Sequence, residues 1–138
     1  MRNKAFLPLM EQICILMFFA VAAAICLQGF AKANQLSHAQ QERDRAVVAV
    51  QNAAEVLKYA RGDLNSTADI LHGHFDGTVV TAFYDAQWKP TLQSGNAAFS
   101  LRVAPLSNDT PFLGSANIQA LRGEEVIFEL NVCWQEVQ

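Results

Sequence analysis

The feature that most constrains the fold is a run of nineteen residues without a charge, Ile13–Ala31. Only Gln28 and Gly29 interrupt its apolar character. At about 1.5 Å per residue, a helix of this length spans roughly 28 Å, close to the hydrocarbon thickness of a bilayer. We therefore expect a leader-like cytoplasmic segment at residues 1–6 and a transmembrane helix at 7–31. This arrangement predicts a single-pass protein of the cytoplasmic membrane with an extracytoplasmic C-terminal domain.

A cleavable signal peptide is the alternative interpretation of the same segment. The chain starts with the basic sequence MRNKA, and Ala31-Lys32-Ala33 has the form of a cleavage site. In that case the mature chain would begin at Asn34. Two observations favour the membrane helix: the uncharged run is long for a signal peptide, and the helical pattern continues beyond the cleavage motif.

The second expected element is an amphipathic helix at 32–61 that continues the first. No Pro or Gly occurs from Asn34 to Arg61, and good helix formers predominate. Apolar side chains recur at helical spacing and form one face, which small side chains widen. These residues are Leu36, Val47, Val50, Ala54 and Leu57, with Ala46, Ala49, Ala53, Val56 and Ala60 beside them. Gly62 is predicted to end the helix as its C′ residue, and Gly29 is a candidate flexible point.

After Gly62 the periodicity changes from helical to alternating. Residues 62–77 are expected to form a connecting loop with one short helical turn near 68–71. The segment 78–138 is expected to form an antiparallel sheet. Four strands are predicted, Thr78–Asp85, Ala98–Pro105, Ser115–Leu121 and Glu125–Trp134. A sheet with one apolar face needs a cover, and the helix Leu36–Ala60 can supply it. The predicted fold class is therefore α+β, a long N-terminal helix packed on a four-stranded antiparallel sheet.

The alternation also predicts which side chains point inward. In the second strand Phe99, Leu101 and Val103 face the core. In the last strand the inner face comprises Val126, Phe128, Leu130, Val132 and Trp134. The first strand has two apolar faces, either Val79, Thr81 and Phe83 or Val80, Ala82 and Tyr84, and alternation does not choose between them. Trp88 and Trp134 are expected to pack at the edges of the core.

Charge and motifs argue against several classes of function. From Lys32 onward the chain carries 8 Lys and Arg against 12 Asp and Glu, a balance of −4, whereas nucleic-acid binding usually requires a basic stripe. No nucleophile elbow, zincin motif or phosphate-binding glycine loop occurs. We expect a protein that is not an enzyme, binds no nucleic acid and carries no cofactor.

The cysteines and histidines give no strong indication of a site. Cys14, Cys26 and Cys133 are too far apart in sequence for a CxxC motif, and they are expected to be buried as small hydrophobic residues. The stretch DILHGHFD gathers four potential metal ligands, Asp69, His72, His74 and Asp76. Their spacing matches no common metal motif, so solvated loop side chains are the favoured interpretation and no metal site is predicted.

The sequence FLPLMEQICILMFFAVAAAICLQGF, Phe6–Phe30, resembles the N-terminal signature of type IV pilins and type II secretion pseudopilins. In that family a short basic leader ends in glycine, and a glutamate occupies the fifth position of the mature chain. Aligned on Glu11, the mature chain would begin at Leu7, and Phe6 stands where the family has glycine. The resemblance implies a pilin-like roll and a candidate processing site at Phe6 and Leu7 for a prepilin peptidase.

The resemblance also implies a role for Glu11. In pilin-like assemblies this carboxylate lies in an apolar bundle and faces the N-terminal amine of a neighbouring subunit. A charge near the centre of a bilayer costs roughly 2.5–3.5 kcal/mol on insertion scales, so it persists where a partner offsets that cost. If Phe6 prevents cleavage, Arg2 or Lys4 would have to neutralise Glu11. The alternative is that Glu11 lies at the membrane interface and contacts water.

The function implied is that of a structural subunit of a type IV pilus-like or type II secretion-like filament. Membrane lipid and other pilin-like subunits are the expected partners. Small side chains at Ala20, Ala22, Ala23 and Ala24 would permit close helix contacts in the membrane. A second hypothesis is a membrane-anchored or secreted extracytoplasmic binding domain that never assembles.

Overall fold

The computed structural model describes residues 4–136, and its elements begin with one long helix, α1, from Phe6 to Tyr59. The contacts divide the chain into two compact units, one ending at Gln41 and the other beginning at Glu42. The first unit contains the N-terminal part of α1. The second contains the rest of α1 and all later elements, and it is called the sheet domain below. Arg2, which would have to neutralise Glu11 if Phe6 prevents cleavage, lies outside the described residues.

Helix α1 is α-helical at every residue between its ends, including Gly29. The sequence suggested a flexible point there, but no interruption of the helix occurs at this glycine. Buried side chains begin only at Ala46 and continue through Val50, Ala53, Ala54 and Leu57. Leu36, which was predicted to belong to the same covering face, is 62% exposed because it precedes the part of α1 that packs on the sheet.

The C-terminal end of α1 has the hydrogen bonds of a Schellman motif. The Gly62 N–H donates to the Leu57 carbonyl at 2.9 Å, and the Arg61 N–H donates to the Lys58 carbonyl at 3.1 Å. Arg61 and Gly62 both have positive φ, 53° and 82°. The glycine was predicted to be the C′ residue, but Arg61 occupies that position and Gly62 is the next residue.

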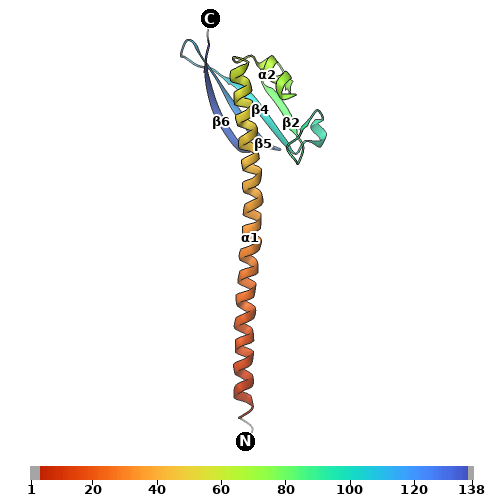
Figure 1. The fold of residues 1–138 in the computed structure, drawn as a ribbon, viewed down its shortest axis with the longest axis vertical. Coiled ribbons are helices and arrows are strands. Elements are labelled where there is room, and N and C mark those ends of the chain that lie inside the picture. The colour runs from red at the N-terminus through yellow and green to blue at the C-terminus, as the bar shows by residue number, and fades with distance from the viewer. Residues whose placement is uncertain (1–3, 137–138) are drawn as a thin grey trace. The chain divides into compact units, whose positions relative to one another are not determined.

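The sheet contains the four predicted strands and two short additions. Its elements are β1 (His74–Phe75), β2 (Val80–Tyr84), β3 (Pro90–Thr91), β4 (Phe99–Leu106), β5 (Leu113–Arg122) and β6 (Glu125–Gln135), with a 3₁₀ turn, η1, at Ser94–Asn96. The strand order is β1-β2-β4-β5-β6, with β3 paired to β2, and all pairs are antiparallel. The α+β class is confirmed, and the C-terminal part of α1 lies across one face of this sheet (Figure 1).

The core lies between α1 and the inner face of the sheet. Val80, Ala82 and Tyr84 are the buried side of β2, which decides between the two faces that the sequence left open. The predicted inner residues of β4, Phe99, Leu101 and Val103, are buried. Strand β5 contributes Ala116, Ile118 and Ala120, all fully buried, although the sequence indicated only a weak strand there. Trp88 and Trp134 are partly buried against this core, as expected.

The inner face of β6 differs from strict alternation at one position. Ala120 pairs with Phe128 but Leu121 pairs with Val126, so Ile127 is the additional residue of a β-bulge. The bulge turns Val126 outward, where it is 43% exposed, and brings Ile127 against the core. The prediction that Val126 faces inward was therefore wrong. The two-residue connection that follows β5 contains Gly123 with φ of 62°, as a tight hairpin requires.

Two further predictions need correction. The connection after α1 contains a complete helix, α2 (Leu64–Leu71), rather than a single turn near 68–71. Asp63 supplies the N-cap that this prediction overlooked, because its carboxylate accepts from the Asn65 N–H at 3.0 Å. All three cysteines are exposed rather than buried. Cys133 lies on the outer side of β6, next to the buried Val132, and Cys14 and Cys26 lie on the uncovered part of α1.

Candidate functional site

The N-terminal unit exposes many large apolar side chains along α1, most of them between Phe6 and Phe30. Within the described part of the chain, α1 is the one helix long and apolar enough to span a membrane. Its large apolar side chains are exposed, including Leu7 at 72%, Phe18 at 78% and Phe30 at 77%. Leaving so much apolar area in water is unfavourable by about 25 cal/mol per Å². This surface therefore requires a lipid environment or contacts with other helices.

The residues expected to take part in processing and assembly lie at the start of this helix. Phe6 is the first residue of α1 and Leu7 the second, so the peptide bond between them belongs to the first helical turn. Pro8 also lies in that turn, where its missing N–H leaves no hydrogen bond unmade. Glu11 follows in the second turn and is exposed. It forms no ion pair with another described residue.

The four alanines that were expected to permit close helix contacts all lie on α1. Ala20 and Ala24 are four residues apart and therefore share one face of the helix, with Ala23 beside them. Ala22 lies on a different side. All four are exposed. The pair Ala20 and Ala24 forms a small-xxx-small pattern, which permits the close approach of a second helix.

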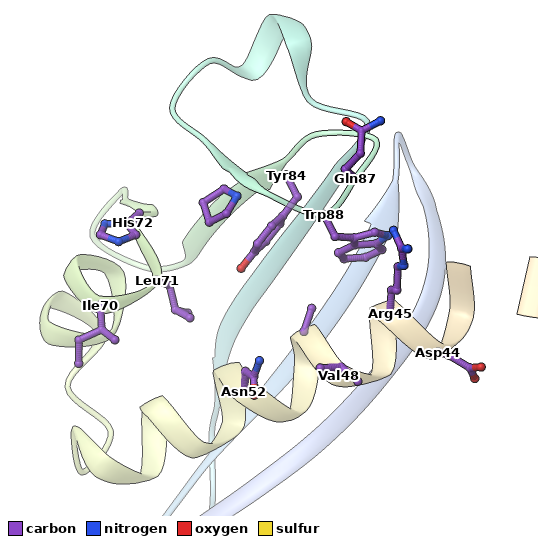
Figure 2. Close-up of a pocket in the computed structure, with 12 residues that line it drawn as sticks. Asp44, Arg45, Val48, Asn52, Ile70, Leu71, His72, Tyr84, Gln87 and Trp88 are labelled. Carbon is purple, nitrogen blue, oxygen red and sulfur yellow. The ribbon is translucent and has the colours of Figure 1, made fainter. Parts of the chain in front are cut away.

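The sheet domain has a cavity of about 620 Å³ that the sequence did not indicate. We call it the α1–Trp88 cavity, because α1 forms one wall and the loop carrying Trp88 another (Figure 2). Apolar side chains dominate its lining, and Val48 and Ile70 are about half exposed within it, at 56% and 47%. The lining residues are Asp44, Arg45, Val48, Ala49, Asn52, Ile70, Leu71, His72, Tyr84, Gln87, Trp88 and Pro90.

The loop between β2 and β3 holds Trp88 in place. The Asp85 carboxylate accepts hydrogen bonds from the backbone N–H groups of Gln87 and Lys89, both at 2.9 Å. The backbone N–H of Trp88 donates to the Asp85 carbonyl. This loop gives Trp88 a φ of 61° and places its indole parallel to the ring of Phe99, with ring centroids 4.3 Å apart. The indole is thus a fixed wall of the cavity.

Only some of the charged and polar side chains that line the cavity point toward it. Figure 2 shows Arg45 extending beside Trp88, whereas Asp44 points away from the cavity. Tyr84 also lines the cavity, and burial raises the pKa of its phenol above the ordinary value of 10.0. The Trp88 indole N–H is buried and donates no hydrogen bond to a described residue.

A second apolar surface lies near the C-terminal end of α1. It comprises Leu106, Phe112 and Leu113, which are 44%, 60% and 38% exposed, and we call it the Phe112 patch. The Phe112 carbonyl accepts from the Glu136 N–H at 2.9 Å, and Leu113 pairs with Gln135 of β6. Phe112 has a φ of 69°, which is rare for a bulky residue.

The four potential metal ligands of the DILHGHFD stretch are distributed over separate local structures. Asp69 lies in α2, His72 is the left-handed C-cap residue of that helix, and His74 belongs to β1. Asp76 caps a turn, because its carboxylate accepts from the N–H groups of Thr78 and Val79, each at 2.8 Å. Among the described residues, no three His, Cys, Asp or Glu side chains come close enough to hold a metal ion.

Comparison with known proteins adds no assignment. No family model matches the chain, and neither the curated proteins nor the solved structures contain a significant match to it. The pilin-like character therefore rests on the architecture, a long apolar N-terminal helix followed by an antiparallel sheet that covers its C-terminal part.

Proposed function

We propose that this protein is a non-enzymatic structural subunit of a type IV pilus-like or type II secretion-like filament. The observation that carries the proposal is that α1 combines two surfaces in one continuous helix. Its first part exposes apolar side chains along a length that matches a bilayer, and its later part is the covering helix of the sheet domain. An apolar helix of this kind can exchange lipid contacts for contacts with the helices of other subunits.

Glu11 is the group we assign to assembly. It is exposed among apolar side chains and forms no ion pair within the described part of the chain. A carboxylate in an apolar environment is strongly favoured to find a cationic partner. The N-terminal amine or Lys4 of a neighbouring copy would supply it. Contacts between Glu11 of one copy and the N-terminus of the next are heterologous, so they extend into a filament rather than close into a dimer.

Cys14 and Cys26 provide a test in native membranes. Both are exposed on the apolar part of α1, so a membrane-permeant bismaleimide can link neighbouring helices. The experiment uses Cys133→Ser to remove the thiol of the sheet domain. Two reactive positions per helix allow a ladder of trimers and longer chains, which we expect. The variant Cys26→Ala, with one reactive position per helix, should stop at dimers. Monomers alone in the first variant would contradict assembly through α1.

A membrane-anchored or secreted binding domain is the second candidate, and the α1–Trp88 cavity favours it. Its volume lies in the usual range of ligand sites, and its lining is largely apolar with a few polar groups. Analysis of the N-terminus and the intact mass separates the two candidates. A chain beginning at Leu7 supports processing by a prepilin peptidase. A chain beginning at Asn34 would have lost Glu11 and would support the secreted binding domain.

A further inference from the structure

The α1–Trp88 cavity and the Phe112 patch lie on different parts of the same domain. The cavity adjoins α1 between Asp44 and Asn52. The patch lies near the C-terminal end of α1, because Leu106, Phe112 and Leu113 line one pocket together with Gly62. From Val48 to Tyr59, the last residue of α1, is eleven residues, or about 16 Å along the helix axis. The two surfaces therefore do not meet within one copy.

Phe112 is presented to the outside by a fixed backbone. Its carbonyl accepts a hydrogen bond from the N–H of Glu136, the residue just after β6, and the pairing of β5 with β6 begins at Leu113. A bulky aromatic residue with a φ of 69° is conformationally strained, and such outliers cluster at sites of function. Here the fixed, strained backbone presents an exposed aromatic ring at the end of the sheet.

The size and the apolar walls of the α1–Trp88 cavity suit an aromatic ring such as that of Phe112. Its walls include Val48, Ile70 and Trp88, and its volume of about 620 Å³ is large enough for an aromatic side chain and the residues next to it. Because the Asp85 loop fixes the indole of Trp88, an entering ring would meet a wall that is already ordered.

The charges of the two surfaces are complementary. The patch is flanked by Asp109 and Glu136, and the segment from Leu106 to Phe112 contains no Lys or Arg. The cavity is lined by the exposed Arg45, which forms no ion pair with another described residue, and by Asp44, whose side chain points away from the cavity (Figure 2). Opposite charges on two separate surfaces favour an encounter between copies.

We propose that Phe112 of one copy inserts into the α1–Trp88 cavity of a second copy, with Asp109 of the first facing Arg45 of the second. The proposal rests on the filament function and adds a head-to-tail contact between sheet domains. Donor and acceptor surfaces differ, so each copy can use both and the contact is open-ended. It predicts that neighbouring copies joined in this way are displaced by about 16 Å or slightly more along the axis of the covering helix.

The test is photo-crosslinking of the full-length chain in native membranes. p-Benzoylphenylalanine replaces Phe112 in one sample and Tyr59 in the control, because Tyr59 is an 83% exposed aromatic that lines neither surface. Mixing isotopically labelled with unlabelled copies identifies links between chains. We expect crosslinks from position 112 to residues 44–52 or 85–90 of another copy. The Tyr59 control should give none there.

A charge exchange provides a second measurement with folded variants. Arg45 and Asp109 are exposed, so Arg45→Asp and Asp109→Arg leave the core intact. Each alone should lower the crosslink yield from position 112 by about two- to fivefold, and the double variant should restore it. Crosslinks that map elsewhere, to the same copy or to another molecule would overturn the proposal, while an intact Cys14 and Cys26 ladder would leave the filament function standing. Loss of that ladder as well would overturn both.

Discussion

Trp134 lies so close to Gly62 that a Cβ at position 62 would be 2.5 Å from the indole ring. Gly114 approaches the same ring even more closely. The indole therefore lies against two glycines, one just past the end of α1 and the other in β5. This contact ties the end of the covering helix to the two longest strands, and it limits the size of the residues at both glycine positions.

Gly114→Ala should destabilise the sheet domain by about 1–3 kcal/mol, because the added methyl group overlaps the Trp134 ring. Gly114 does not have positive φ, so the effect is steric. Chemical denaturation followed by tryptophan fluorescence measures it. The matched control is Gly95→Ala, where nothing lies within 4 Å of the added Cβ and the change should stay within about 0.5 kcal/mol. Equal stabilities of the two variants would contradict the packing described.

Leu57→Ala should cost about 2–5 kcal/mol, since Leu57 is fully buried between α1 and the sheet. Leu36→Ala is the comparison within the same helix and should change the stability of the sheet domain by less than about 0.5 kcal/mol, because Leu36 is exposed. The denaturation midpoints of the two variants measure these two changes in stability. A large loss for Leu36→Ala would mean that the covering face extends further toward the N-terminus.

Arg122→Ala should have a small effect, although its guanidinium lies 2.6 Å from the Glu42 carboxylate. The two side chains are 51% and 39% exposed, and ion pairs in such positions contribute about 0.2–1 kcal/mol. A double-mutant cycle with Glu42→Ala isolates the pair, and its coupling should decrease at high salt. A coupling well above 1 kcal/mol that salt leaves unchanged would show a buried interaction instead.

The stability of the sheet domain should fall in acid through Asp63 and Asp76. Hydrogen bonds from Ser66 and Asn65 lower the pKa of Asp63, and those from Val79 and Thr78 lower the pKa of Asp76, each below its ordinary value of 3.8. The ionised carboxylates therefore stabilise the fold above that value. This stabilisation is lost as the pH falls from about 3.8 through the lower pKa of the folded state.

Melting temperatures between pH 6 and pH 2.5 test this dependence. The wild-type melting temperature should drop below about pH 4, and Asp63→Asn combined with Asp76→Asn should weaken the drop. If the double variant has the same acid sensitivity as the wild type, other groups are responsible.

The parts of the fold with strong periodicity were predictable from the sequence. The alternation in Phe99, Leu101 and Val103 and the helical spacing of Val50, Ala54 and Leu57 correspond to buried faces. Features set by tertiary contacts were not predictable. The bulge at Ile127 breaks the alternation without a glycine to mark it, and α2 depends on the Asp63 cap rather than on a long apolar pattern.

The candidate sites also comprise some that a local sequence pattern predicts and some that only the folded structure reveals. Glu11, Phe6 and Leu7 could be named from the sequence because the motif is local. The α1–Trp88 cavity combines residues from α1, α2 and the β2–β3 loop, which are brought together only by folding. The left-handed backbone of Trp88 and Phe112 gives no signal in the sequence, because neither residue usually adopts it.

The most direct test of the account is the effect of Glu11 on the crosslinked ladder of Cys14 and Cys26 in native membranes. The samples are Glu11→Ala, Glu11→Gln and, as the control, Glu55→Ala, which removes an exposed carboxylate from the later part of α1. We predict that both Glu11 variants lose the species beyond dimers by about tenfold or more, a difference of about 1.4 kcal/mol in association, while Glu55→Ala retains them. A ladder in Glu11→Ala equal to that of Glu55→Ala would show that Glu11 merely contacts water at the membrane surface and would contradict assembly through this carboxylate.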